Sequence, residues 1–488
     1  MQPEEQLIKQ RIDKLEKIKK LGINPYPYKF EAKNFSNEIL DKYSKLKNEQ
    51  KTKDKVSIAG RVITLRPMGK IAFGHLQDYH GKIQFFINEK EISKKEFELL
   101  NLLDLGDIIG INGTIFRTKA GEITVFVNKL ELLTKSLRPL PDKWHGLKDI
   151  EERYRRRYVD LIANPEVKEI FIKKFKIINS IRETLNNQGY IEVDTPIIQS
   201  VYGGANAKPF KTYVNDLKRD AYLRISDELY LKRLIVGGFD RVYELSKDFR
   251  NESIDTKHNP EFTMIEYYQA YADYNDMMKS TENIILNANK IIGNKNEIQF
   301  MGNKINLKAP FKIMTMKEAI KKFSEIDVDK LNDKELFKLK DKYRLEHNGP
   351  LTRGWMIQLL FEHFAESKLI NPTFIIEHPR ETTPLCKGSR KDPSLIERFE
   401  LFIGGFELSN GYSELNNPIT QRELLEEQAK ELRAGFEEAN PMDEDFVRAI
   451  EQGMPPTGGV GIGIDRLVMV LTGKDSIKDV ILFPMMKN

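Results

Sequence analysis

Three short motifs, separated by long stretches of ordinary sequence, constrain both the fold and the chemistry of this chain. Residues 189–196 read GYIEVDTP, residues 248–252 read DFRNE with HNPEFT following at 258–263, and residues 459–466 read GVGIGIDR. The second and third motifs each contain an arginine. A guanidinium matches phosphate or carboxylate oxygens as a bidentate fork and does not lose its charge in proteins. Together the motifs indicate a site for a polyanionic nucleotide and its metal.

Each motif alone has an ordinary explanation. A single arginine is more often part of a surface ion pair, and glycines also serve turns and close packing. The glycines at 459–463 lack the Gly-x-Gly-x-x-Gly spacing of a dinucleotide fingerprint, and the chain has no Gly-x-x-x-x-Gly-Lys-Ser/Thr phosphate loop. The functional interpretation therefore rests on the order of the three motifs and on their flanking residues.

Composition limits the class of protein. A chain of 488 residues is long enough for two or more domains, and its net charge of +5 permits nucleic-acid binding without demonstrating it. The single cysteine, Cys386, excludes an internal disulfide and a cysteine-based zinc site. The N-terminus is charged from Glu4 onward, and no apolar run approaches the ~18 residues of a membrane span. These features predict a cytoplasmic protein without a membrane segment.

The first 53 residues are predicted to form a basic helix and a tether. Residues 4–21 carry apolar side chains at helical spacing, and Gly22 ends the pattern. The opposite face carries six basic residues: Lys9, Arg11, Lys14, Lys17, Lys19 and Lys20. This face is either solvated or in contact with nucleic acid, and the sequence does not decide between the two.

Residues 54–135 are predicted to form a β-barrel. Five strand patterns at 56–65, 71–78, 82–88, 107–116 and 122–132 are separated by turn residues, with one helical segment at 91–103 between the third and fourth. Five strands with a helix at that point indicate an OB-fold, which binds oligonucleotides on a curved sheet face. Residues 136–160 follow as a linker.

Residues 161–488 are predicted to form a larger α+β domain. A helix begins at Pro165 after Asn164 and ends at Gly189, and the strand of the first motif follows it. Further strands are expected at 242–246, 262–268, 373–377, 399–402 and 459–462. Residues near 275–368 are interpreted as a mostly helical insertion.

The three motifs, in this order, resemble the signature motifs of class II aminoacyl-tRNA synthetases. The runs YGGANAKPF at 202–210, ELYLKR at 228–233 and NGYSEL at 410–415 extend the resemblance to the bacterial type of lysyl-tRNA synthetase, over nearly the whole chain. The resemblance implies an OB-fold anticodon-binding domain followed by a class II catalytic domain built on an antiparallel sheet flanked by helices.

The resemblance also implies an activity. The enzyme is expected to ligate L-lysine to tRNA(Lys) in two steps, through a lysyl-adenylate formed from ATP with release of pyrophosphate. Such chemistry needs positioning and charge stabilisation more than a protein nucleophile. A homodimer is expected, because the first motif forms the subunit interface in the family.

Residue roles carry over from the motifs. Arg250 and Arg466 are the expected catalytic residues, with Arg250 between the lysine carboxylate and the α-phosphate. Glu252 is expected to accept from the adenine amino group, and Phe262 to stack on adenine, although a strand phenylalanine is more often core. The expected ATP-binding residues are Arg250, Glu252, Lys257, His258, Phe262, Glu400, Glu407 and Arg466. Many relatives have arginine at position 257 and glycine at position 253.

Magnesium is the expected cofactor of ATP. Glu400 and Glu407 resemble the carboxylates that hold it, and carboxylate oxygens suit Mg²⁺. Gly404 and Gly405 lie between them and are expected to permit the chain break that aims both inward. The ordinary alternative is a pair of strand glutamates facing solvent.

Selection of lysine is expected to depend on acidic side chains, because burying an ammonium is costly unless carboxylates meet it. Glu266 and Glu414 are expected to face the side-chain ammonium, and Glu228 and Gly204 the α-amino end. The full expected lysine pocket is Gly204, Glu228, Arg250, Glu266, Tyr268, Asn410, Tyr412 and Glu414.

The barrel is expected to read the anticodon. By resemblance the contacting residues are Phe73, His75, Gln84 and Glu122, with Phe73 stacking on a base. The alternative for Phe73 is a place in the barrel core.

Two other functions compete with tRNA ligation. A lysyl transferase that modifies a protein, as in the lysyl ligase of elongation factor P, resembles the catalytic domain alone, whereas this chain also has the barrel. A non-catalytic RNA-binding paralog is expected to lose Arg250, Glu252 or Arg466, and all three are present. The His-Ile-Gly-His and Lys-Met-Ser-Lys-Ser signatures of class I enzymes are missing from the sequence.

Overall fold

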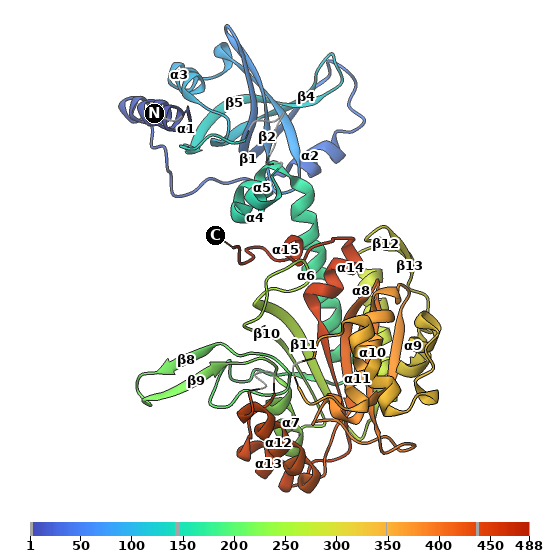
Figure 1. Ribbon diagram of the computed structural model, residues 1–488. Helices are drawn as coiled ribbons and strands as arrows, with labels where there is room; N and C mark the ends of the chain where they lie inside the picture. The colour runs from blue at the N-terminus through green and yellow to red at the C-terminus, as the bar shows by residue number, and fades with distance from the viewer. Residues whose placement is uncertain (1–2, 142–146, 148, 348, 436–438, 488) are drawn as a thin grey trace. The chain divides into compact units, whose positions relative to one another are not determined.

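The chain folds into two compact units, Met1–Lys148 and Asp149–Asn488 (Figure 1). The structure, a computed structural model, describes residues 3–141, 147, 149–347, 349–435 and 439–487. Each unit has its own hydrophobic core, and each is described separately below.

The first unit is a closed five-stranded barrel, as predicted. Its strands are β1 Lys51–Met68, β2 Ile71–Gln77, β3 Lys82–Asn88, β4 Ile108–Arg117 and β5 Ile123–Thr134, in the closed order β1-β2-β3-β5-β4. Along β2 and β3, buried residues alternate with partly exposed ones, so each strand gives one face to the core. Helix α3 (Lys94–Leu102) lies in sequence between β3 and β4 and begins with a capping box of Ser93 and Glu96.

Helix α1 (Pro3–Lys20) is anchored to this unit by part of its basic face. Arg11 donates to the carbonyl oxygens of Leu105 and Ser136, each at 3.0 Å, and Lys14 Nζ lies 2.6 Å from Asp104 Oδ1. Two of the six basic residues expected on the outer face therefore hold the helix in place. A second short helix, α2 (Ser36–Lys42), follows before the barrel.

An eight-stranded mixed sheet organises the second unit. Its order is β14-β15-β16-β17-β18-β11-β10-β6. The strands are β6 Ile191–Glu192, β10 Arg241–Phe249, β11 Glu261–Ala270, β14 Lys312–Thr315, β15 Thr373–Pro379, β16 Leu395–Ile403, β17 Phe406–Ser413 and β18 Thr457–Gly463. Central pairs are antiparallel, as predicted, but the edge pairs β14–β15 and β6–β10 are parallel.

Helices cover one face of this sheet. The helices α6 (Pro165–Asn187), α8 (Tyr274–Ile291) and α14 (Ile464–Thr472) share a core with the sheet residues Tyr267 and Ile462. A separate core is built by α9 (Met316–Ser324), α10 (Asp333–Tyr343) and α11 (Arg353–Phe364). The stretch near 275–368 thus holds these helices, and it also supplies edge strand β14 and the hairpin of β12 (Glu297–Phe300) and β13 (Asn303–Asn306).

The remaining elements of the chain are short strands, helices and turns. They are α4 Ile150–Arg155, α5 Arg157–Ala163, β7 Ile198–Gln199, β8 Lys211–Val214, β9 Arg219–Leu223, α7 Glu228–Val236, α12 Pro418–Arg433, α13 Glu444–Glu451 and α15 Ile477–Val480, with short 3₁₀ turns at Glu89–Glu91, Val328–Lys330, Glu366–Lys368 and Arg380–Thr382. Helices α7, α12 and α13 pack together around Leu231, Leu425 and Phe446. Figure 1 shows β8 and β9 as a hairpin that projects from this unit.

A membrane-spanning helix would have to be long and strongly apolar. Among the described residues, no helix meets both conditions.

Candidate active site

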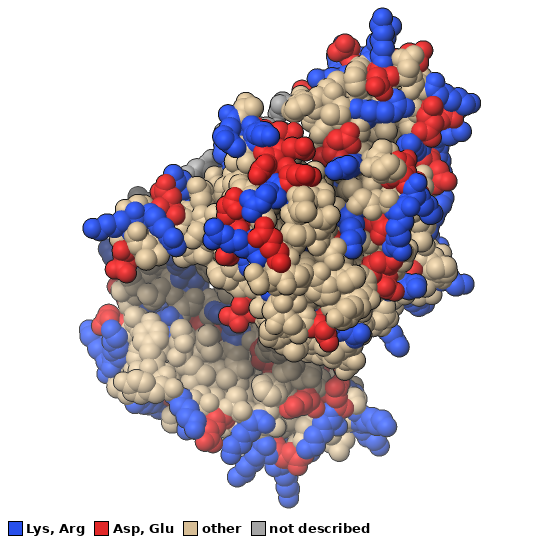
Figure 2. Space-filling model, turned by 90° about the horizontal axis from the view of Figure 1, so that it is seen from below, with Lys and Arg blue, Asp and Glu red and all other residues tan. Residues whose placement is uncertain are grey.

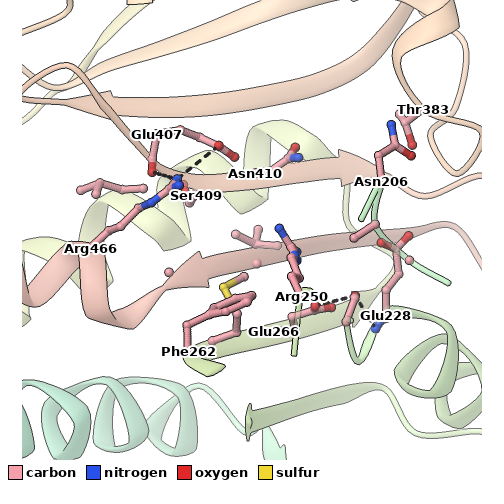
Figure 3. A pocket seen from close by; sticks show the side chains of 18 of the residues that line it. Asn206, Glu228, Arg250, Phe262, Glu266, Thr383, Glu407, Ser409, Asn410 and Arg466 are labelled. Atoms are coloured by element: carbon pink, nitrogen blue, oxygen red, sulfur yellow. Dashed lines mark hydrogen bonds and ion pairs between the residues drawn. The ribbon is translucent and has the colours of Figure 1, made fainter. Parts of the chain in front are cut away.

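A cavity of about 380 Å³ opens on the sheet face opposite to α6, α8 and α14. The residues predicted from the sequence that line it are Gly204, Glu228, Arg250, Glu252, Lys257, His258, Phe262, Glu266, Tyr268, Glu407, Asn410, Tyr412, Glu414 and Arg466. Figure 3 shows Arg466 and Phe262 toward one end, Glu228 and Asn206 toward the other, and Arg250 between them. Figure 2 shows the hollowed face of the molecule, with both Lys or Arg and Asp or Glu side chains along its margins.

Strand β11 places four cavity residues by simple alternation. Phe262, Met264, Glu266 and Tyr268 all line the cavity, because side chains two residues apart in a strand share a face. The intervening residues Ile265 and Tyr267 belong to the helix-covered core. One strand therefore presents both an aromatic ring and a carboxylate at the cavity wall.

Strand β18 lies between β11 and β17 and supplies the floor of the cavity. Gly459 pairs with Tyr268 on one side and with Tyr412 on the other. A Cβ atom at Gly459 would lie 2.2 Å from Glu414 Oε1 and 2.3 Å from Tyr268 Cε1. Gly459 is therefore required by close approach, since any side chain here would enter the space that these two groups occupy.

Both odd- and even-numbered residues of strand β17, such as Glu407 and Asn410, line the cavity because the strand contains a β-bulge. Phe402 pairs with Glu407, whereas Leu401 pairs with Ser409, so Leu408 is an extra residue. A bulge of this kind reverses which side chains face one side of a sheet. The prediction that Gly404 and Gly405 aim the carboxylates is corrected by this geometry: both glycines have positive φ and form the hairpin turn, and the bulge orients Glu407.

Arg250 lies just beyond the end of β10, beside the expected adenine platform. Its guanidinium carbon is 5.1 Å from the centroid of the Phe262 ring, and its Nε donates to the carbonyl oxygen of Ile225 at 3.4 Å. The backbone N–H of Arg250 donates to the carbonyl oxygen of Pro260 at 2.9 Å, which ties the two strands of the second motif together. Phe262 is only partly buried, so its ring is available at the cavity wall.

Arg466 lies toward the same end of the cavity as Phe262 and is held there by side-chain and backbone contacts. Its Nη1 donates to the backbone carbonyl oxygen of Glu407 at 3.0 Å, and its Nη2 lies 3.1 Å from His258 Nε2. His258 Nδ1 in turn lies 2.9 Å from Asp255 Oδ2. Lys257 Nζ lies 4.4 Å from the centroid of the Phe406 ring. This end of the cavity carries cationic side chains and contains Lys257 and His258, both of which were expected to bind ATP.

The opposite end is acidic and buried. Ser226 Oγ donates to Glu266 Oε1 at 2.7 Å, and the Tyr268 hydroxyl donates to Glu266 Oε2 at 3.0 Å. Burial, followed by the charges of Asp248 and Glu228, raises the pKa of Glu266 to about 8. Burial is also the largest cause that raises the pKa of Glu414 to about 8. Both carboxyls are therefore in surroundings that favour a cationic ligand once they are ionised.

Glu400 and Glu407 lie on the neighbouring strands β16 and β17. Among the described residues, Glu407 lines the cavity and Glu400 does not. Glu400 accepts a hydrogen bond from Arg398, a cavity residue, and Arg466 Nη1 lies 3.5 Å from Glu407 Oε2. Burial and then the charge of Glu400 raise the pKa of the Glu407 carboxyl. A divalent cation would relieve that repulsion, and hard carboxylate oxygens fit Mg²⁺.

The predicted anticodon residues gather on the outer face of the barrel. His75 Nε2 lies 2.7 Å from Glu122 Oε1, and Gln84 donates to the same carboxylate. Phe73 is partly buried on the strand face opposite the core residues Ala72 and Leu76, so it lies outside the barrel core. Its ring centroid is 4.7 Å from that of Phe86, at the start of an aromatic row that continues through Phe126 and Phe116.

Several cavity residues were not predicted. Asn206 belongs to the run at 202–210 that carries the resemblance, and Ser226 lies two residues before the run at 228–233. Arg398 and Asn440 come from stretches that carried no signal. Lys232, behind the cavity wall, lies inside the run at 228–233. Its partner Glu228 is one helical turn earlier, but its second partner Glu414 could not be known from spacing along the chain.

Comparisons with known proteins agree with this geometry. The model of the class II tRNA synthetases (D, K and N) matches residues 149–487, and the model of the OB-fold nucleic acid binding domain matches residues 56–133. The lysine–tRNA ligase of Carboxydothermus hydrogenoformans is 50% identical over 487 residues, which are 99% of this chain and 98% of the relative. The lysine–tRNA ligase of Methanoculleus marisnigri is 49% identical over 485 residues, 98% of this chain and 94% of the relative. The chain therefore belongs to the lysine–tRNA ligase family of class II tRNA synthetases, with an OB-fold domain before the catalytic one.

Proposed function

We propose that this chain ligates L-lysine to tRNA(Lys) in two steps. A lysine carboxylate oxygen attacks the α-phosphorus of ATP, the bond to pyrophosphate breaks, and lysyl-adenylate forms. A ribose hydroxyl at the tRNA 3′ end then attacks the lysyl carbonyl carbon and AMP leaves. The observation that carries the proposal is one cavity with Arg466 and Phe262 toward one end, Arg250 in the middle, and the buried Glu228, Glu266 and Glu414 among its remaining lining residues.

Arg250 is proposed as the group between the two reacting anions. A carboxylate and an α-phosphate repel each other, and a guanidinium between them offsets the repulsion. Because Arg250 is already held against Phe262 and Ile225, little reorganisation is needed when charge develops. Positioning of this kind supplies most of what adenylate formation requires.

The nucleotide is proposed to lie between Phe262 and Arg466. Phe262 would stack on one face of adenine and Arg466 would meet the other face and the γ-phosphate. Glu252, which is exposed at the cavity mouth, would accept from the adenine amino group. Lys257 and His258 would contact the pyrophosphate end, where a cationic wall stabilises the departing phosphates.

Lysine is proposed to bind at the acidic end. Glu266 and Glu414 would face its side-chain ammonium, and Glu228 and the backbone at Gly204 its α-amino group. Tyr268, Asn410 and Tyr412 would complete the wall. A buried ammonium requires carboxylate partners, and this end of the cavity supplies three.

Glu400 and Glu407 would hold Mg²⁺, which neutralises phosphate charge when ATP is bound. Their remaining contacts, to Arg398 and Arg466, keep both carboxylates in ion pairs near the phosphate end.

The barrel is proposed to bind the anticodon through Phe73, His75, Gln84 and Glu122. The aromatic row beginning at Phe73 presents ring faces on which unpaired bases can stack.

The domain division proposed is 1–53, 54–135, 136–160 and 161–488. The proposed place of action is the cytoplasm.

A homodimer is proposed, with the first motif in the interface. Phe175 on α6 and Ile191 after it are each about half exposed in the single chain, and Ile197 and Ile198 extend this apolar surface. A two-fold contact is the commonest oligomer symmetry. A mass of two chains in sedimentation at micromolar concentration is expected, and a monomer would contradict the assignment of this surface.

Transfer of labelled lysine tests both chemical steps. With ATP and tRNA(Lys), label is expected on the tRNA. With tRNA whose terminal ribose hydroxyls have been oxidised, no label is expected, although lysine-dependent exchange of pyrophosphate into ATP continues. If lysine does not support pyrophosphate exchange in the presence of intact tRNA, the proposal is overturned.

A further inference from the structure

Lys232 is a fully buried cation between two of the proposed lysine-binding carboxylates. Its Nζ lies 2.5 Å from Glu228 Oε1, one turn earlier on α7, and 2.5 Å from Glu414 Oε2, which follows β17. The exposed fraction of the Lys232 side chain is 0%, and both carboxylates line the cavity while Lys232 does not. The protein therefore carries its own ammonium directly behind the wall at which a substrate ammonium would arrive.

A diammonium amino acid supplies the charges that this arrangement can pair. Glu228, Glu266 and Glu414 are three carboxylates within one buried pocket. Lys232 supplies one ammonium, and lysine would supply two more, while its own carboxylate meets Arg250. Buried charges are tolerated only when they are paired, so the full complement of partners is reached on binding.

We propose that Lys232 is a positioning residue for substrate selection, which holds Glu228 and Glu414 in place and stabilises their ionised forms for lysine binding. This inference rests on the proposed function and names a determinant of its specificity. Lys232 does not touch the substrate, and it acts only through the two carboxylates that do.

The charges around the pair support this role. The groups that act on Glu414, Glu228 or their close neighbours are Lys232, Glu266, Tyr268, Tyr412, Cys386 and Arg398. Burial opposes a charge on Lys232, but Glu228 and Glu414 outweigh it and hold the pKa of Lys232 above its usual value. In return Lys232 is the largest influence that lowers the pKa of Glu414 against the effect of burial. Removing the ammonium therefore raises the pH at which the carboxylates ionise.

The test is Lys232→Met, which keeps the length of the side chain and removes its charge. The readout is lysine-dependent exchange of pyrophosphate into ATP, measured from pH 6.5 to 9. At pH 7 the KM for lysine is expected to rise about tenfold or more, with the acid limb of kcat/KM displaced upward by about one pH unit, because one pKa unit is a factor of ten in the ionised fraction. The maximal rate at high pH is expected to remain close to that of wild type.

The barrel offers a matched control. Lys135 is also buried between two carboxylates, with Nζ 2.6 Å from Asp104 Oδ2 and 2.7 Å from Asp107 Oδ2. Lys135→Met removes a buried ammonium of the same kind from the unit that takes no part in adenylate formation. Its exchange kinetics and pH profile are expected to match wild type, so a general effect of losing a buried lysine is separated from the role of Lys232.

A second variant covers the case in which Lys232→Met does not fold. The double variant Lys232→Met/Glu414→Gln removes one positive and one negative charge together. Its discrimination between lysine and norleucine should equal that of Glu414→Gln alone. The reason is that Lys232 acts on the side-chain ammonium through Glu414. A further loss of about tenfold would overturn the inference, because independent sites add.

The outcomes separate the two proposals. If wild type shows no lysine-dependent exchange, the proposed function fails regardless of Lys232. If wild type is active and folded Lys232→Met has an unchanged KM and an undisplaced acid limb, only the role of Lys232 is overturned. If Lys232→Met raises KM and lowers kcat by the same factor and does not displace the pH profile, Lys232 has a structural role and the inference is also overturned.

Discussion

The guanidinium carbon of Arg250 lies 5.1 Å from the centroid of the Phe262 ring, although the two residues belong to different segments of the second motif. The contact arises because β10 and β11 pair in register, with Phe249 opposite Glu261 and Asp248 opposite Phe262. A hairpin of two strands thus fixes a charge beside an aromatic face at the cavity wall.

Arg250→Ala is expected to remove lysine-dependent adenylate formation while the protein stays folded. Loss of one preorganised donor to developing charge typically lowers kcat by about 10²–10³-fold. The measurement is pyrophosphate exchange, with circular dichroism to confirm folding. Arg138→Ala, at an exposed linker arginine, is the control and should behave as wild type. Near-normal exchange in folded Arg250→Ala would exclude the catalytic role.

Phe73→Ala is expected to separate the two steps. Charging of tRNA should weaken, because a lost base–aromatic stack costs about 1–3 kcal/mol, whereas pyrophosphate exchange should be almost unchanged. Tyr28→Ala provides the comparison, since Tyr28 is a fully exposed aromatic in the same unit, away from the aromatic row. If exchange falls as much as charging in Phe73→Ala, Phe73 supports the structure and does not read a base.

Glu414→Gln is expected to raise the lysine requirement. The change keeps the shape of the side chain and removes one carboxylate from the proposed ammonium site, so binding weakens by at most about 3–5 kcal/mol. Affinity for ATP should barely change, because Arg250, Phe262 and Arg466 are untouched. The informative comparison is with norleucine, which has no side-chain charge. The substitution should weaken binding of norleucine less than binding of lysine. Equal losses for the two ligands would assign Glu414 a structural role.

Asp227→Asn is expected to alter the dependence of stability on pH. Burial, then the charges of Asp248 and Glu266, raises the pKa of Asp227 to about 10, against about 3.9 in an unfolded chain. Between these values the folded state holds a proton that the unfolded state has lost, so the free energy of unfolding falls as pH rises. In Asp227→Asn this contribution to the pH dependence is absent. The free energy of unfolding of the variant relative to that of wild type should therefore increase from pH 6 to pH 9.

Chemical unfolding at several pH values measures this effect. Asp216→Asn, at an exposed aspartate, should give a curve parallel to wild type. In Asp227→Asn, Arg224 keeps its contacts at 2.6 Å to Glu244 and 3.4 Å to Asp248, so loss of the fold is not expected. Parallel curves for wild type and Asp227→Asn would mean that Asp227 is ionised in the folded protein.

Much of this structure could be predicted from local sequence. The barrel strands follow from alternation and turn residues, and α6 follows from Pro165 and its apolar spacing, because these signals lie within single elements. The parallel edge pairs of the sheet could not be predicted, since pairing partners such as β14 and β15 are far apart in sequence. Resemblance placed Arg250, Glu266 and Arg466 at one site, and the cavity contains all three.

Other details depend on tertiary contacts that leave no local pattern. The extra residue at Leu408, which turns Glu407 into the cavity, appears only when β16 and β17 are paired. The need for glycine at position 459 becomes clear only when Tyr268 and Glu414 are seen to occupy the space of its missing side chain. Lys232 reads as an ordinary helix lysine, and its second carboxylate partner is 182 residues away in sequence.

The most direct test of the central claim is ATP–pyrophosphate exchange measured with each of the twenty amino acids in turn. An acidic pocket with Glu228, Glu266 and Glu414 predicts exchange that depends on lysine, requires Mg²⁺, and is weak or undetectable with the neutral and acidic amino acids. Exchange supported better by another amino acid, or no exchange with lysine, would contradict the account.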